Sequence, residues 1–259
     1  MKAMTFFLVV CFFLANPAQA AAPAPEFKSI ACMFELQAEA YRFLRLGQQI
    51  QQASNNPVQV GRLKTQIKAS AQELFLNVRE ARAGLVNAGM QNPYRQLEDI
   101  VSDYVSDAIS STDSQDLGAL KYKQNALIRL AAESVQQLEQ KIGSPSTRRL
   151  ALVGRAKVNV ERFAHDFEMC KLHCDQVLAG ELADLERGLD EMRNALPRHF
   201  SQHAYELAKN QMVFMRLSVE RRAKSSSMDL AQHNLIVAGG NLWELIDTAL
   251  DSYTGTGGE

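Results

Sequence analysis

The chain has 259 residues, of which 46% are hydrophobic and 22% charged, a composition typical of a globular protein. Its 28 Lys and Arg residues nearly balance 29 Asp and Glu residues, so the formal net charge of −1 excludes the basic footprint of a general nucleic-acid-binding protein. The length alone permits one or two domains.

The first 20 residues have the pattern of an export signal. A basic residue precedes the apolar run 4–15, which is too short to cross a bilayer. Small residues at Ala18 and Ala20 then form a signal-peptidase pattern, whereas a lipoprotein site at Cys11 is disfavoured by the bulky valine before it. We therefore predict cleavage after Ala20, a periplasmic mature protein and no later membrane span.

The remaining sequence predicts an all-α protein. Apolar residues recur at steps of three and four, and strand-like alternation is almost absent. Breaks at Gly, Pro and polar clusters divide the chain into seven or eight helices. The expected helices cover about 27–53, 57–87, 93–110, 114–142, 145–178, 181–196, 197–223 and 228–253, followed by a disordered tail at 254–259.

An internal repeat suggests two modules. The tripeptide at 41–43 matches that at 161–163, an offset of 120 residues, and each half contains about four helices. We therefore expect two antiparallel four-helix-bundle modules in tandem, at 21–143 and 144–253. The fifth helix carries the apolar seam of the second module, made of Val153, Ala156, Val160, Phe163, Phe167, Cys170, Cys174 and Val177.

The same fifth helix carries a row of basic residues. Arg148, Arg155 and Arg162 are spaced by seven and lie opposite the seam, while Lys157 lies on its flank. A solvated face is the favoured interpretation of such a row. The alternative is a homodimer in which a second subunit covers this face, so that guanidinium groups of two chains form an anion site.

The segment "LVGRAKVNVERFA", residues 152–164, resembles the signature helix of the type IV pili methyl-accepting chemotaxis transducer N-terminal (PilJ-like) domain. That family is related to nitrate and nitrite sensor domains. Gly154 matches the glycine of the signature, Lys157 stands where a central arginine is expected, and Arg162 matches the final arginine. A lysine at the central position loses the bidentate geometry of guanidinium.

A first copy of the signature lies at 30–43, "IACMFELQAEAYRF", which keeps Arg42 but has Phe34 and Gln37 in place of the glycine and the central arginine. The resemblance covers most of the mature chain as two copies. It implies a sensor-like domain that binds a small anion or contacts a membrane chemoreceptor or pilus-system partner. The ligand-binding candidates are Arg155, Lys157, Arg162 and Arg42.

Three cysteines remain after signal cleavage: Cys32, Cys170 and Cys174. In an oxidising compartment a disulfide between two of them is favoured, including a pairing of Cys32 with either of the others, and buried thiols are the alternative. A third possibility is a metal site, because thiolate and imidazole suit a soft or borderline metal. Its ligands would be His165, Cys170, His173 and Cys174.

No catalytic motif is visible in the sequence. It contains no G-x-S-x-G, no Gly-rich phosphate loop and no H-E-x-x-H, and we expect neither enzymatic activity nor a cofactor. We predict a soluble periplasmic binding or adaptor protein of the sensor-like kind. Two alternatives stay open: a redox or metal carrier that uses the cysteine cluster, and a structural envelope protein without a ligand.

Overall fold

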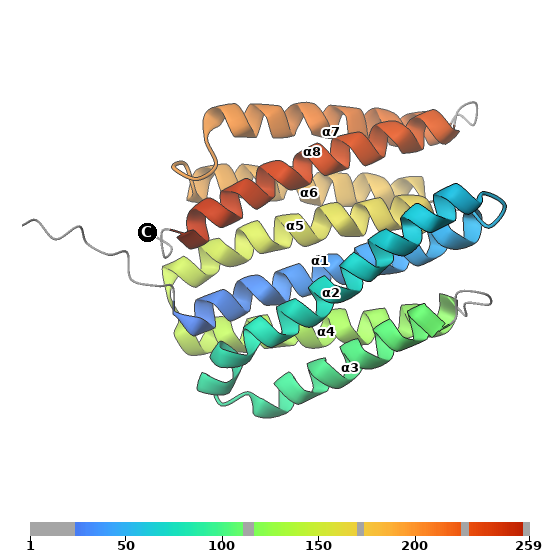
Figure 1. Cartoon of the computed structure of the whole chain (residues 1–259). Coiled ribbons are helices and arrows are strands. Elements are labelled where there is room, and N and C mark those ends of the chain that lie inside the picture. Colours follow the sequence, from blue (N-terminus) through green and yellow to red (C-terminus); the bar gives the residue numbers. More distant parts are fainter. Residues whose placement is uncertain (1–23, 111–116, 170–173, 224–227, 256–259) are drawn as a thin grey trace, which may run out of the picture.

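The computed structural model describes residues 24–110, 117–169, 174–223 and 228–255. These residues form eight α-helices and no strand, which confirms the all-α prediction; the predicted signal peptide lies outside them (Figure 1). None of the helices in the described ranges is long and apolar enough to cross a membrane. The helices are α1 (Pro25–Gln52), α2 (Pro57–Asn87), α3 (Gln91–Ser110), α4 (Leu117–Ile142), α5 (Pro145–Met169), α6 (Asp175–Ala195), α7 (Gln202–Ala223) and α8 (Met228–Gly255).

Several helix ends follow directly from local chemistry. The Asn56 side chain accepts a hydrogen bond from the backbone N–H of Gln59 at 3.2 Å, and Pro57 occupies the first turn of α2. Gly89 and Gly143 have φ values of 73° and 64°, a left-handed conformation that ends α2 and α4. These breaks lie where the sequence predicts them.

The boundary between the fifth and sixth helices differs from the prediction. The sequence analysis places it near residue 180, but α5 ends at Met169, α6 begins at Asp175, and Gly180 lies inside α6. The carboxylate of Asp175 suits the first turn of a helix because it complements the helix dipole. Val177, predicted to lie in the seam of the fifth helix, is therefore on α6 and 59% exposed.

The start of the seventh helix is also later than predicted. The sequence analysis opens it at Pro197, but α7 begins at Gln202. The hydroxyl of Ser201 accepts a hydrogen bond from the backbone N–H of Ala204 at 3.2 Å. A hydroxyl cap therefore sets this helix start in place of the proline.

The helix contacts follow two cycles. In the first set α1 packs on α2, α2 on α3, α3 on α4 and α4 on α1; in the second set α5, α6, α7 and α8 pack in the same order. The contact between α1 and α5 joins the sets, and one hydrophobic cluster includes residues from both. Because the core is shared in this way, the division into two separate four-helix-bundle modules stays a prediction.

The α1–α5 contact is parallel and in register. Phe34 lies against Gly154, an offset of 120 residues, and Arg42 bonds Glu161, an offset of 119. Because the offset is nearly constant at these two levels, both helices run in the same direction. Figure 1 shows the two helices side by side at the middle of the molecule.

Polar side chains are buried on α1, which packs against α2, α4 and α5. Gln37, Glu39 and Gln48 are each less than a tenth exposed. Burial of polar and charged groups costs free energy unless they are hydrogen-bonded or paired. Charged groups of α1 are indeed paired, since Arg42 binds both Glu39 and, on α5, Glu161.

Candidate functional site

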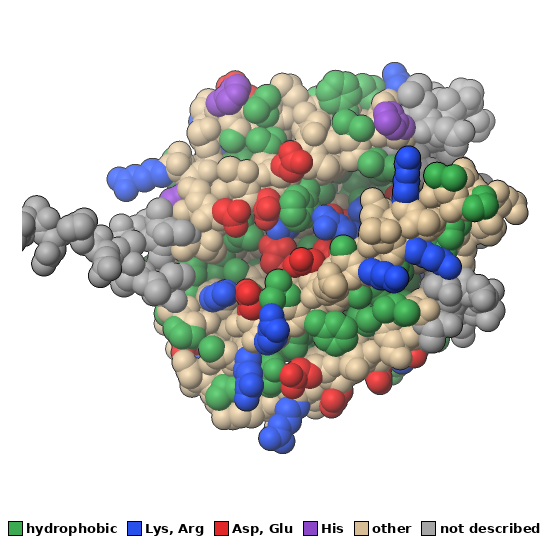
Figure 2. Space-filling model, viewed as in Figure 1, with side chains coloured by type: hydrophobic (Ala, Val, Ile, Leu, Met, Phe, Trp, Pro, Cys, Tyr) green, Lys and Arg blue, Asp and Glu red, His purple; other side chains and the backbone are tan. Residues whose placement is uncertain are grey.

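A groove of about 580 Å³ lies between the two sets of helices. Its lining comes from α1 and α5, which pack together, and from α2 and α8, which flank them. Figure 2 shows acidic and basic side chains gathered around a hollow between α2 and α8. The volume lies in the range typical of small-molecule sites.

A chain of ion pairs lines the groove. The guanidinium of Arg42 donates to Glu39 at 3.2 Å and to Glu161 at 2.9 Å. Arg45 lies 3.0 Å from the other oxygen of Glu161 and 4.0 Å from Glu168. The Glu161 side chain, only 6% exposed, thus sits between two guanidinium groups. Carboxylates of the protein already pair with both arginines.

Further carboxylates surround this chain. Burial raises the pKa of both Glu39 and Glu168 above the ordinary glutamate range, although guanidinium groups nearby act to lower it. The amide of Gln49 donates to both oxygens of Glu168, at 3.0 and 2.9 Å. Glu73 and Glu244 also line the groove and are exposed. Acidic groups therefore outnumber basic ones.

Trp243 connects the groove to a buried lysine. The Lys157 side chain is 2% exposed and pairs with both Glu35 and Asp247. Its Nζ lies 4.1 Å from the centre of the indole of Trp243, and the guanidinium of Arg42 lies 5.1 Å from the same ring. The indole N–H is buried and has no hydrogen-bond partner among the described residues. The groove therefore contains a hydrogen-bond donor that the described residues do not satisfy.

Two adjacent glycines of α8 face the groove. Gly239 and Gly240 both belong to its lining, and a Cβ added to either would meet no atom within 4 Å. A glycine inside a helix costs about 1 kcal/mol relative to alanine. Packing within the protein does not require this pair, in contrast to Gly154, where a Cβ would overlap the ring of Phe34. The missing side chains leave space beside α8 in the groove, where Gly239 is buried and the backbone of Gly240 is exposed.

Of the four residues proposed for anion binding, the structure brings only Arg42 and Lys157 together, around the indole of Trp243. Arg155 is exposed, and Nε of Arg162 lies 3.2 Å from Glu181, outside the groove lining. Only Arg42 lines the groove, with Lys157 beneath Trp243. Lys157, predicted on the flank of the apolar seam, is buried between α1 and α8, where Glu35 and Asp247 pair with it.

The predicted pairing of Cys32 with another cysteine does not form. Cys32 is a free, buried thiol whose pKa burial raises to about 12, whereas Cys174 is disulfide-bonded. In the parallel register of α1 and α5, Cys32 lies level with Leu152. From there α5 runs 17 residues, roughly 25 Å, to its end at Met169. The third cysteine, Cys170, lies outside the described residues.

The metal hypothesis gains no support from the described part of the chain. No group of three or more His, Cys, Asp or Glu residues there could hold a metal ion. His165 is buried, with Nδ1 2.9 Å from the carboxylate of Asp166 and its ring edge-on to Tyr41. Cys170 and His173 lie outside the described residues, so their part of the hypothesis stays a prediction.

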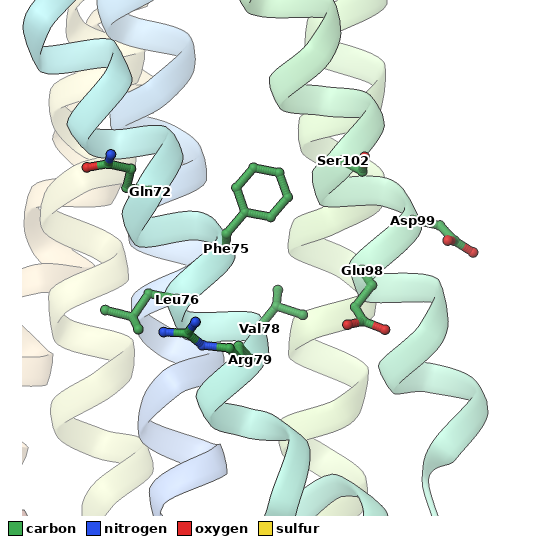
Figure 3. A pocket seen from close by; sticks show the side chains of 8 residues that line it. All are labelled: Gln72, Phe75, Leu76, Val78, Arg79, Glu98, Asp99 and Ser102. Carbon is green, nitrogen blue, oxygen red and sulfur yellow. The ribbon is translucent and has the colours of Figure 1, made fainter.

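A second hollow, of about 560 Å³, lies between α2 and α3 (Figure 3). Phe75 of α2 points toward α3, while Asp99 points away into solvent. The charged residues of its lining, Arg79, Glu98 and Asp99, are all exposed. A hollow lined only by exposed charges is less suited to selecting a ligand than the groove, where the carboxylates of Glu39, Glu161 and Glu168 are largely buried.

No family model, curated protein or solved structure matches the chain. The resemblance to the PilJ-like domain therefore rests on the residue pattern alone. Among the described residues, the groove brings together buried ion pairs, an unpaired indole N–H and two helical glycines.

Proposed function

We propose that the mature chain is an exported, periplasmic solute-binding protein of the sensor-like kind, and that its ligand occupies the groove between the two sets of helices. The observation that carries this proposal is the glycine pair 239–240, which lines the groove and leaves space where side chains would lie, without serving any packing contact. Glycine at these positions would allow a ligand to approach the backbone of α8 closely.

Other features of the groove support binding over a purely structural role. A structural helical protein gains nothing from two adjacent glycines, since alanine would make α8 more stable. The buried indole N–H of Trp243 has no hydrogen-bond partner among the described residues, and a bound solute, or water held beside it, could supply the acceptor. The proposed role is non-enzymatic.

The position of the groove suggests how binding is reported. A solute there would contact both sets of helices at once, through α2 on one side and α8 on the other. Its binding energy would therefore favour one placement of the sets over others. A membrane chemoreceptor or a pilus-system partner could recognise that placement, which is the adaptor part of the proposal.

The test uses alanine at the glycines. We expect Gly239→Ala and Gly240→Ala to raise the free energy of unfolding by about 1 kcal/mol each, because they improve helix propensity. Both should reduce or abolish any rise in melting temperature that a panel of amines, carboxylates, amino acids and oxyanions causes in the native protein. At a hundred times its Kd a ligand adds about 2.7 kcal/mol, which is easily measured.

Gly180→Ala is the matched control. Gly180 lies inside α6, is exposed, has no atom within 4 Å of an added Cβ and is not part of the groove lining. It should stabilise the protein to a similar degree and leave the solute response unchanged. A solute response that survives alanine at both groove positions, or no response to any solute, would refute the proposal.

A further inference from the structure

The groove carries surplus negative charge. Two guanidinium groups face five carboxylates, a surplus of three, and the lysine beneath Trp243 is itself matched by two carboxylates. Excess charge of one sign in a cleft with low-dielectric walls attracts ligands of the opposite sign. The charged lining residues are Arg42, Arg45, Glu39, Glu73, Glu161, Glu168 and Glu244.

The acidic groups in question are poorly hydrated. The side chains of Glu39 and Glu168 are 10% and 3% exposed. Burial raises the pKa of both carboxyl groups even though guanidinium groups lie nearby, so the arginines of the protein do not fully compensate for the lost hydration. An additional cation in the groove would therefore be stabilised strongly.

These two carboxylates mark opposite ends of the groove. Glu168 is held by Gln49, which lies ten residues beyond Glu39 on α1, a separation of about 15 Å along the helix axis. Glu73 adds its charge at the Glu39 end, where it acts to raise the pKa of that group. A single compact cation would reach only one end.

Apolar side chains also line the groove between the ends, beside the paired Arg42, Arg45 and Glu161. Leu46 from α1, Ala164 from α5 and Ile236 from α8 all belong to the lining, next to the open backbone of Gly240. Ile236 is 52% exposed, which is apolar area that a ligand could cover. Methylene groups packed there would gain from the hydrophobic effect.

We infer that the groove selects a linear di- or polyamine, whose ammonium groups pair with the acidic ends and whose methylene chain lies across Leu46, Ile236 and Gly240. This inference rests on the proposed function, because it names the class of solute for the same groove. A small anion is disfavoured, since it would reach Arg42 and Arg45 only by displacing Glu161 from both.

The test compares three probes on the full mature chain by thermal shift and titration calorimetry. Spermidine carries separated ammonium groups, propylamine carries one, and suberate is an extended dianion. We expect spermidine to raise the melting temperature and to bind at least about tenfold more tightly than propylamine, because it reaches both acidic ends. Suberate should produce no shift.

The matching variants change exposed carboxylates only. Glu73→Gln combined with Glu244→Gln should weaken spermidine binding by about tenfold, since two exposed charge pairs are lost. Glu191→Gln, an exposed residue of α6 outside the groove lining, should leave the Kd within about twofold.

Each alternative outcome overturns the inference in a recognisable way. A larger shift with suberate than with spermidine would mean that the groove takes an anion, which contradicts the charge inference and leaves the proposed function standing. Equal losses in the Glu191 variant and the double variant would mean that spermidine binds acidic surface in general. No shift with any probe would also overturn the inference, and the wider solute panel with the glycine variants would then decide the proposed function separately.

Discussion

Lys157 is enclosed by Glu35 of α1 and by Trp243 and Asp247 of α8. Its own side chain is 2% exposed, whereas those of the two carboxylates are 28% and 30% exposed. The three groups therefore depend on the pairing to different degrees. The lysine is almost completely shielded from water, whereas each carboxylate remains partly hydrated.

This asymmetry predicts unequal costs of removing either side. The double variant Glu35→Gln/Asp247→Asn should lower the free energy of unfolding by about 3 kcal/mol or more, because it leaves a buried ammonium group without a counter-charge. Lys157→Met should cost less, because the remaining carboxylates can rehydrate. Urea unfolding at neutral pH measures both variants. A larger loss for Lys157→Met would contradict this account.

Glu181 on α6 predicts a pH effect. Burial and then the hydrogen bond with Asp166 raise its pKa from 4.5 to about 8, so the folded state holds its proton more tightly than the unfolded state. The stability this gives is fully present below about pH 4.5 and is lost as the pH rises to about 8. Glu181→Gln keeps a neutral side chain at all pH values. The melting temperature of Glu181→Gln, relative to that of the native protein, should therefore increase as the pH rises from 5 to 8. Glu191→Gln is the control. If the melting temperatures of Glu181→Gln and the native protein change in parallel with pH, the prediction is wrong.

At the scale of the helices, α1 and α5 fit together through unlike residues. The ring of Phe34 occupies the space where a side chain on Gly154 would lie. The sequence comparison treats Phe34 as a departure from the signature glycine. The packing explains it, because a large residue on one helix and none on the other allow close approach.

A double-mutant cycle tests this fit. Gly154→Ala should destabilise the protein by about 1–3 kcal/mol through overpacking, despite the better helix propensity of alanine. In a Phe34→Ala background the same change should be neutral or should stabilise by about 1 kcal/mol. Chemical denaturation of the four proteins gives the coupling energy. Equal effects of Gly154→Ala in both backgrounds would show that the ring does not set the spacing.

Several helix ends and most apolar faces were predictable from local chemistry, although the α5–α6 boundary and the start of α7 were not. Asn56, Pro57 and Gly143 act within one turn of the chain, so their effects can be seen in the sequence. The burial of Lys157 could not be predicted, because it depends on carboxylates 90 and 122 residues away. Periodicity shows which side of a helix is apolar, but not which distant helix will cover its polar side.

The groove could not be predicted from the sequence for the same reason. Of its lining only Arg42 was a candidate, and it was proposed to bind an anion instead of pairing with Glu161. One signal was available: two adjacent glycines, Gly239 and Gly240, interrupt an otherwise helical period ahead of Trp243. Such a pair lowers helix propensity without marking a helix end.

At the scale of the whole molecule, the two sets of helices share their core. The α1–α5 contact and the charged cluster around Lys157 join them, and a single hydrophobic cluster extends through both. Loss of either set would expose the apolar and charged side of the helix it leaves behind. Folding of the sets should therefore be coupled.

We expect the mature protein to unfold in a single cooperative transition. Differential scanning calorimetry should give a calorimetric enthalpy equal to the van't Hoff enthalpy, the mark of two-state behaviour. The variants at Gly154 and Lys157 should shift this one transition without splitting it. Two resolved transitions would instead support the tandem modules as independent folding units.

The in-register pairing of α1 with α5 affects binding stoichiometry. If two identical chains met through such a helix pair, twofold symmetry would put the same residue on both sides and create two equivalent grooves. In a single polypeptide, the residues at corresponding positions of the two helices can differ. Arg42 pairs with Glu161 in the groove, whereas Arg162 pairs with Glu181 outside it. The two sides of the α1–α5 contact are therefore chemically different, and we expect each molecule to bind one solute.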